Sequence, residues 1–193
     1  QLDMKGALAQ GSAPVASMTV ELDNYDNRYS PYNTSSPLHS SIMATTTTDG
    51  GLTVQYPQLW QVPLRVRVGF GNLPERISVF TGLIDEPDES YGVGGSRVVF
   101  RCFDIGGALL KRKLSTVLTR NVNTRDWIIY MMQAAGMGAY IGANMDAGIF
   151  YIPNAWLDDE DVYSEATKAA GSEGGYFYFN ENGKSVFRNA AWW

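Results

Sequence analysis

Hydrophobic and polar residues alternate along several short segments in the first half of the chain. At 16–22 every second residue is apolar, and at 64–70 arginines alternate with aliphatic residues. A period of two residues is typical of strands that bury one face. Further strands are predicted at 77–84 and 97–103, so this half of the chain is rich in β-structure.

Two segments of this half do not alternate. The first 14 residues are weakly patterned and are interpreted as an arm or a first strand. Residues 32–58 are polar, with runs of serine and threonine, and predict a long loop. Two interpretations of the loop stay open: a plain surface excursion, and an arm that contacts a neighbouring subunit.

Helical spacing replaces strand spacing further along the chain. Three helices are predicted, at 105–114, 124–136 and 157–171. Asp104 suits the N-cap of the first, and Asn123 or Thr124 that of the second. The acidic run 158–161 is interpreted as the first turn of the third helix, where it meets the positive end of the helix dipole. Aromatic segments on both sides of Asn182-Gly183 predict a hairpin.

Together these elements predict a mainly β fold with an α+β second part. A β-barrel-like domain is expected at 1–115, followed at 116–193 by a small domain of helices and a hairpin. The chain opens at Gln1 and stops at two tryptophans, Trp192 and Trp193, which favours a piece of a longer polypeptide.

Composition and charge narrow the classes of function. The net charge of the 193 residues is −5, and the 15 lysines and arginines are thinly spread. A nucleic-acid-binding face needs clustered positive charge, so sequence-specific nucleic-acid binding is not expected. No apolar run approaches the ~20 residues of a membrane span. Cys102, the single cysteine, is interpreted as a buried strand residue.

The sequence offers few candidates for catalytic or metal-binding residues. His39 is the only histidine, and no nucleophile elbow, phosphate loop or zinc-protease motif is present. The oxygen-bearing residues at 23–27 resemble a calcium loop, but its glycine and its distal glutamate are missing, so a capped turn is preferred. We therefore predict no enzymatic activity, no cofactor and no metal.

Aromatic residues in the second half of the chain leave one alternative function open. Trp156, Tyr176 and Tyr178 are candidates for a saccharide-binding platform, as in a carbohydrate-binding β module of an adhesin or tip protein. In the other interpretation, the same residues belong to the core and to a protein contact surface.

Several short motifs follow one another in a fixed order. They are Asp23-Asn24-Tyr25-Asp26-Asn27-Arg28-Tyr29-Ser30-Pro31, Pro63-Leu64-Arg65-Val66-Arg67-Val68-Gly69, Phe80-Thr81-Gly82-Leu83-Ile84-Asp85, the 104–114 and 124–136 helices, Ala155-Trp156-Leu157-Asp158, and the segment from Glu173 to Gly183. In this order they resemble the N-terminal part of phage tail hub proteins, the tail-associated or minor tail proteins similar to the baseplate hub of contractile phages. Asn27 stands where that group usually has glycine, a mild departure because asparagine tolerates the left-handed conformation.

The resemblance implies a structural protein of the virion, located at the tail tip. Such hubs are homotrimers that match or close the hexameric tail tube, so 1–115 would be a tail-tube-type β-barrel and 116–193 the start of a second hub domain. The implied partners are other copies of the chain, the tail tube or distal tail ring, the tape measure protein, and tip fibres or receptor-binding proteins. Candidate subunit-interface residues are Tyr29, Pro31, Asp49, Arg65 and Arg67.

Overall fold

The computed structural model describes residues 2–3, 15–30, 32–36, 39, 43–47, 53–57, 63–68, 77–92 and 95–192. The chain divides into two compact units. The first comprises Gln1–Asp3, Ser17–Leu64 and Gly82–Phe103, and the second comprises Met4–Ala16, Arg65–Thr81 and Asp104–Trp193. The predicted domain boundary at residue 115 stays a prediction.

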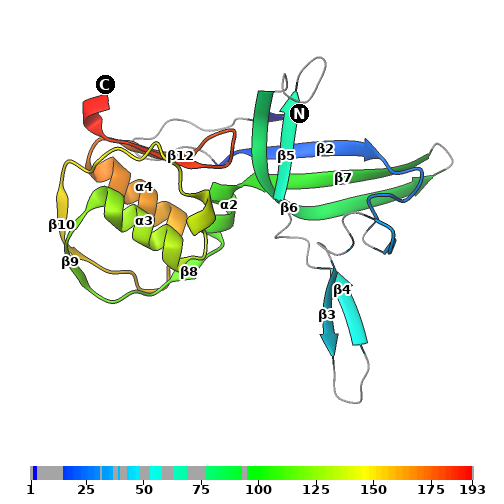
Figure 1. The fold of residues 1–193 in the computed structure, drawn as a ribbon, viewed down its shortest axis with the longest axis horizontal. Coiled ribbons are helices and arrows are strands. Elements are labelled where there is room, and N and C mark those ends of the chain that lie inside the picture. The colour runs from blue at the N-terminus through cyan, green and yellow to red at the C-terminus, as the bar shows by residue number, and fades with distance from the viewer. Residues whose placement is uncertain are drawn as a thin grey trace. The chain divides into compact units, whose positions relative to one another are not determined.

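A five-stranded sheet lies mostly in the first unit, and its residues between Arg65 and Thr81 belong to the second. Its strands, in spatial order, are β1 (Leu2–Asp3), β2 (Ser17–Asp23), β7 (Gly95–Asp104), β6 (Ile77–Gly92) and β5 (Pro63–Val68). Figure 1 shows β2, β7 and β6 side by side. β2 and β7 are antiparallel, with Ser17 opposite Phe103 and Asp23 opposite Arg97. The predicted strands are confirmed here, although β6 runs eight residues beyond its predicted end at residue 84.

The two faces of this sheet differ in polarity. On one face Val98, Phe100 and Cys102 of β7 are buried. The apolar residues of β2 that lie opposite them are only half-buried: Met18, Val20 and Leu22. On the other face Arg97 and Glu21 form an exposed ion pair of 2.8 Å. The β2 side of the apolar face is therefore less fully covered than the β7 side.

The structure differs from two predictions for this half of the chain. In the described sheet β1 and β5 are the edges, so no closed barrel is seen there and the tail-tube-type barrel is not confirmed. The predicted loop at 32–58 contains an antiparallel hairpin of β3 (Met43–Thr47) and β4 (Thr53–Pro57), so that prediction was wrong in part. Threonine made the segment look like a polar loop, but its branched Cβ also favours strands.

A buried asparagine organises the turn that follows β2. The Asn24 side-chain oxygen accepts a hydrogen bond from the Tyr29 amide at 2.9 Å, and the backbone N–H of Asn24 donates to the Ser96 carbonyl at 2.8 Å. Asn27 has φ +54°, the left-handed conformation that asparagine tolerates. The ring of Tyr29 packs edge-on against Phe100, with centroids 6.1 Å apart. The turn is thus fixed to the sheet at both ends.

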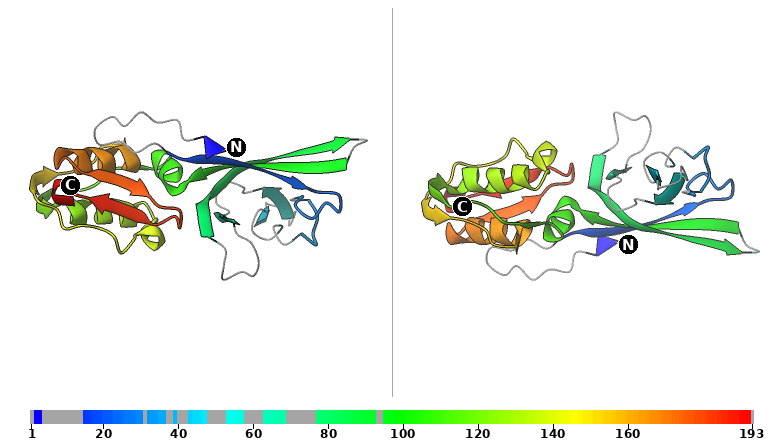
Figure 2. Two further views of the ribbon diagram at one scale, coloured as in Figure 1. Left: turned by 90° about the horizontal axis from the view of Figure 1, so that it is seen from above. Right: turned by 90° about the horizontal axis from the view of Figure 1, so that it is seen from below.

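The second unit combines helices with short antiparallel ribbons. Its elements are α2 (Ile105–Leu110), β8 (Lys113–Leu114), β9 (Thr119–Asn123), α3 (Thr124–Ala134), η3 (Gly138–Tyr140), β10 (Tyr151–Ala155), β11 (Glu160–Asp161), α4 (Val162–Ser172), β12 (Tyr176–Phe179), β13 (Ser185–Arg188) and η4 (Ala190–Trp192). The pairs are β9 with β10, β8 with β11, and β12 with β13. The views of Figure 2 show the β12–β13 hairpin running beside α3 and α4.

The helix α3 confirms its prediction closely. It begins after Asn123, whose side chain accepts a hydrogen bond from the Arg125 amide, and it ends at Ala134. Its apolar face is buried: Trp127, Ile128, Met131 and Met132. Asp104 likewise caps α2, accepting from the Gly107 amide at 2.9 Å. The two N-caps are therefore where the sequence places them.

The other two predicted helices are shorter than expected. α2 ends at Leu110, because Lys113 and Leu114 pair with β11 in a ribbon. α4 begins only at Val162, so the acidic run 158–161 is not its first turn. Asp159 lies in a bend with φ +54°, and Asp161 is the N-cap, accepting from the Ser164 amide at 2.7 Å. Only Asp161 thus meets the helix end directly.

The thiol of Cys102 should be inert in the folded protein. It is buried on β7, and burial raises the pKa of the Cys102 thiol to about 11. Since the thiolate is the reactive form, we expect modification by a disulfide reagent at pH 8 to be at least ~100-fold slower in the folded protein than in urea. Equal rates in both states would show that Cys102 is exposed.

Tyr163 gives the second unit a dependence on alkaline pH. Its ring packs near Phe177 and Phe179, at centroid distances of 5.9 and 6.5 Å. Burial, with the nearby Asp104 carboxylate, raises the pKa of Tyr163 above its usual value. A raised pKa in the folded state stabilises the protein below the unfolded pKa, and this stabilisation is lost as the pH rises.

The variant Tyr163→Phe isolates that dependence. Between pH 9 and pH 11 we expect the wild type to lose about 1.4 kcal/mol more of its free energy of unfolding than the variant, because only its unfolded state ionises this phenol. Urea unfolding at each pH measures the difference. Parallel curves for both proteins would contradict the assignment.

Candidate functional site

Exposed apolar side chains are the candidate site among the described residues. Among them no group of three or more histidine, cysteine, aspartate or glutamate side chains is arranged to hold a metal ion. No helix in the described part of the chain is long and apolar enough to cross a membrane. The candidate functional site therefore consists of exposed apolar side chains that the fold holds in place.

The acidic turn after β2 is used for backbone capping. Asp23 accepts from the Tyr25 amide and Asp26 from the Arg28 amide, both at 3.1 Å. These are Asx-turn bonds, in which a carboxylate bonds the backbone two residues on. The capped turn preferred over a calcium loop is thus what the structure shows.

The predicted subunit-interface residues are only partly described. Tyr29 is half-buried against the sheet of the first unit, and Arg65 is exposed on the edge strand β5. Arg67 lies on the same strand, and only its backbone is described. Pro31 and Asp49 lie outside the described residues. A role of these five residues in a subunit interface stays a prediction.

The three predicted saccharide-binding aromatics do not line one hollow. Trp156 is 60% exposed and borders a hollow of about 310 Å³, whose other described lining residues are Thr116 and Leu118. Tyr176 and Tyr178 lie on β12, on the face opposite the buried Phe177. Saccharide binding by these residues stays a prediction.

Three consecutive residues with large apolar side chains are exposed on the second unit. Ile149, Phe150 and Tyr151 are 44%, 57% and 61% exposed. They lead into β10 and are called the 149–151 ridge. Isolated exposed apolar residues are common, whereas adjacent ones on a fixed backbone indicate a contact surface.

A buried carboxylate holds the backbone of the ridge. Glu173 is only 3% exposed, and its two oxygens accept from the Ile149 amide at 3.0 Å and the Phe150 amide at 2.9 Å. Glu173 is the C-cap residue of α4, where the helix dipole disfavours negative charge. The two charge-assisted hydrogen bonds offset this cost and the cost of burial.

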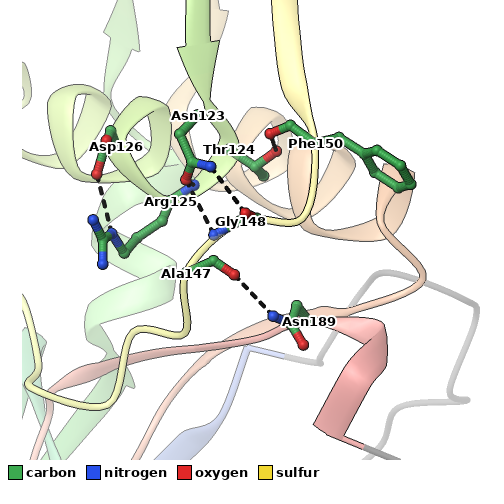
Figure 3. A network of polar contacts seen from close by, with 8 residues as sticks. All are labelled: Asn123, Thr124, Arg125, Asp126, Ala147, Gly148, Phe150 and Asn189. Atoms are coloured by element: carbon green, nitrogen blue, oxygen red, sulfur yellow. Dashed lines mark hydrogen bonds and ion pairs between the residues drawn. The ribbon is translucent and has the colours of Figure 1, made fainter.

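The start of α3 clamps the same segment from the other side (Figure 3). The Asn123 side chain donates to the Gly148 carbonyl at 2.9 Å and accepts from the Gly148 amide at 3.1 Å. The amide and hydroxyl of Thr124 lie 3.4 Å from the Phe150 carbonyl. A Cβ on Gly148 would meet the Asn123 side chain at 2.6 Å, so glycine is required there. Figure 3 shows the Phe150 ring pointing away from this clamp.

The C-terminal strand secures the loop before the ridge. Arg188 and Asp146 form a half-buried ion pair of 2.8 Å, and the Asn189 side chain donates to the Ala147 carbonyl at 2.8 Å. The backbone between Ala147 and Phe150 is thus hydrogen-bonded by four side chains, those of Asn123, Thr124, Glu173 and Asn189.

Sequence reasoning missed the ridge and its anchor. No element was predicted at 141–155, although the apolar run 149–152, ended by Pro153, is a short strand signal. Glu173 was noted only as part of a longer motif. An acid at the end of a helix, followed directly by two glycines, is a signal that its charge has a partner elsewhere.

Comparison with known proteins gives similarity at low levels only. The chain matches no family model and no curated protein. Among solved structures it is similar to a tail protein from Neisseria meningitidis MC58, with 14% identity and a TM-score of 0.48 over 76% of this chain and 49% of that one. It is also similar to the 43 kDa tail protein of prophage MuSo2 from Shewanella oneidensis, with 13% identity and a TM-score of 0.47 over 77% and 52%. The chain spans about half the length of each.

The anchor can be tested with Glu173→Gln. The amide keeps the size of the side chain but turns one acceptor into a donor that faces a backbone amide. We expect the free energy of unfolding, measured in urea, to fall by about 2–3 kcal/mol. Glu181→Gln is the control, since Glu181 is exposed and should change it by less than about 0.5 kcal/mol. Equal stability of Glu173→Gln and wild type would contradict the anchor.

Proposed function

We propose that this protein is a structural component of a bacteriophage tail, without catalysis of its own. In this proposal it forms a homotrimeric hub at the tail tip that adapts to or closes the hexameric tail tube. The ordered motifs at 23–31, 63–69, 80–85 and 173–183 support the proposal from the sequence side. The observation that carries it is the 149–151 ridge, an apolar surface fixed by buried polar groups and suited to a protein contact.

Two further features favour assembly. A stable interface buries roughly 800 Å² per partner, which three side chains do not supply. The half-buried apolar residues of β2 add to the surface available, and the described sheet ends in two edge strands, β1 and β5. Open edges invite pairing with other chains unless a neighbour covers them. A closed ring of subunits would cover both features.

The proposed hub has defined neighbours. Other copies of the chain form the ring, and the tail tube or distal tail ring and the tape measure protein contact it. Tip fibres or receptor-binding proteins attach to it. The net charge of −5 suits a channel through which DNA passes, because a negative wall repels phosphates.

The mass in solution tests the proposal. Light scattering should give about three times the 21.3 kDa of one chain, and electron microscopy of the same sample should show rings with threefold symmetry. A monodisperse monomer at micromolar concentration would count against the hub.

Phe150→Ser tests the ridge as part of that contact. Truncating an exposed aromatic ring that is buried in the assembly should raise the dissociation constant of the trimer at least about 10-fold while leaving the monomer folded. Trp192→Ser is a matched control, because Trp192 is also 57% exposed and lies on η4. Sedimentation velocity over a concentration series measures both. Equal effects of the two variants would show that the ridge plays no special part.

A further inference from the structure

A second surface lies at the opposite end of β10 from the ridge. Trp156 and Leu118 are exposed and border the hollow of about 310 Å³, and Val117 beside them is also exposed. The lining is mostly apolar, and the hollow is open to solvent. Phe150 and Trp156 are six residues apart, or roughly 20 Å along an extended chain, so the two surfaces are separate.

Two hydrogen bonds between Thr116 and Leu157 hold the walls of the hollow. The Thr116 amide donates to the Leu157 carbonyl at 2.9 Å, and the Leu157 amide donates to the Thr116 hydroxyl oxygen at 3.0 Å. Leu157 itself is buried, which directs its neighbours Trp156 and Asp158 outward. These hydrogen bonds fix the backbone next to Trp156. The hollow is therefore a formed feature of the structure.

Charged residues stand near the lining residues in the sequence, acidic ones after Trp156 and a basic one after Leu118. Beyond Trp156, Asp158 and Glu160 are exposed and have no ion-pair partner among the described residues, whereas Asp159 is paired with Lys113 at 2.8 Å. The hydrogen bond to Asp159 raises the pKa of Lys113, and the negative charges of Asp159 and Glu160 raise it further. On the β9 side the exposed Arg120 follows Leu118 by two residues.

We propose that the hollow beside Trp156 binds an apolar side chain of a partner protein that is flanked by lysine or arginine. Trp156 and Leu118 take the apolar side chain, and Asp158 with Glu160 attract the basic neighbour. Arg120 repels that neighbour and so directs it to the acidic side. Exposed tryptophan in a formed apolar hollow is a typical anchor of protein contacts. This site is independent of the ridge and of the proposed trimer.

A saccharide fits the hollow less well. Sugar sites combine an aromatic face with several polar groups that fix the hydroxyls. Here the polar side-chain groups of the described lining residues are the Thr116 hydroxyl and the Trp156 indole N–H, and the Thr116 oxygen already accepts from Leu157. The acidic side also offers nothing specific to a neutral sugar, but it complements a basic peptide.

The test uses three capped peptides on the intact chain. The probe is Gly-Lys-Leu-Lys-Gly, and the controls are Gly-Glu-Leu-Glu-Gly and Gly-Lys-Gly-Lys-Gly. Titration is followed by NMR at the Trp156 indole N–H and the Leu118 methyl groups. We expect saturable shifts with the probe, with a dissociation constant on the order of millimolar, and weaker binding of both controls.

Variants assign the contacts. Trp156→Ala should abolish the Leu118 shifts, whereas Trp192→Ala should leave them unchanged. Asp158→Asn should weaken probe binding by about 1.5- to 5-fold, and Arg120→Gln should strengthen it by a similar factor, as expected for exposed charges. Raising the salt concentration to 1 M should reduce both charge effects.

Three results would overturn the proposal. The first is the absence of any saturable shift with the probe up to 20 mM, a concentration on the order of ten times the expected constant. The second is equal binding of the lysine and glutamate peptides. The third is saturable binding of a cell-wall saccharide at Trp156 that excludes the probe, which would assign the hollow to a sugar instead.

Discussion

Two hydrogen bonds from backbone amides to one buried carboxylate determine which apolar side chains the second unit exposes at 149–151. Glu173 lies at the end of α4, and it holds Ile149 and Phe150 at the start of β10. Burying a charge is costly unless hydrogen bonds satisfy it, so moving this segment away from Glu173 is unfavourable. Asn123 and Thr124 fix the same segment from α3. Two helices therefore present three apolar side chains to solvent.

The sequence predicts those elements that local rules determine. The α3 helix, its cap Asn123, the cap Asp104 and the strand β2 follow from side-chain period and capping preference. The early end of α2 and the late start of α4 do not, because both depend on the pairing of β8 with β11 across 46 residues of chain. Long-range pairing of two-residue strands leaves almost no local signal.

The candidate site was largely hidden for the same reason. Trp156 is a predicted saccharide-binding aromatic, and the structure places it at a hollow, but with Leu118 rather than with Tyr176 and Tyr178 as its neighbour. The ridge depends on a carboxylate 23 residues away from the Phe150 amide it binds. A contact surface depends on residues that the fold brings together from distant parts of the chain, whereas catalytic residues often stand in a recognisable sequence motif.

Footprinting with hydroxyl radicals at rising protein concentration tests the central claim most directly. If the 149–151 ridge lies between subunits, Phe150 and Tyr151 become protected as the chain assembles, while Trp192, equally exposed in the single chain, keeps its reactivity. Assembly that leaves Phe150 and Tyr151 as reactive as in the dilute protein would contradict the account.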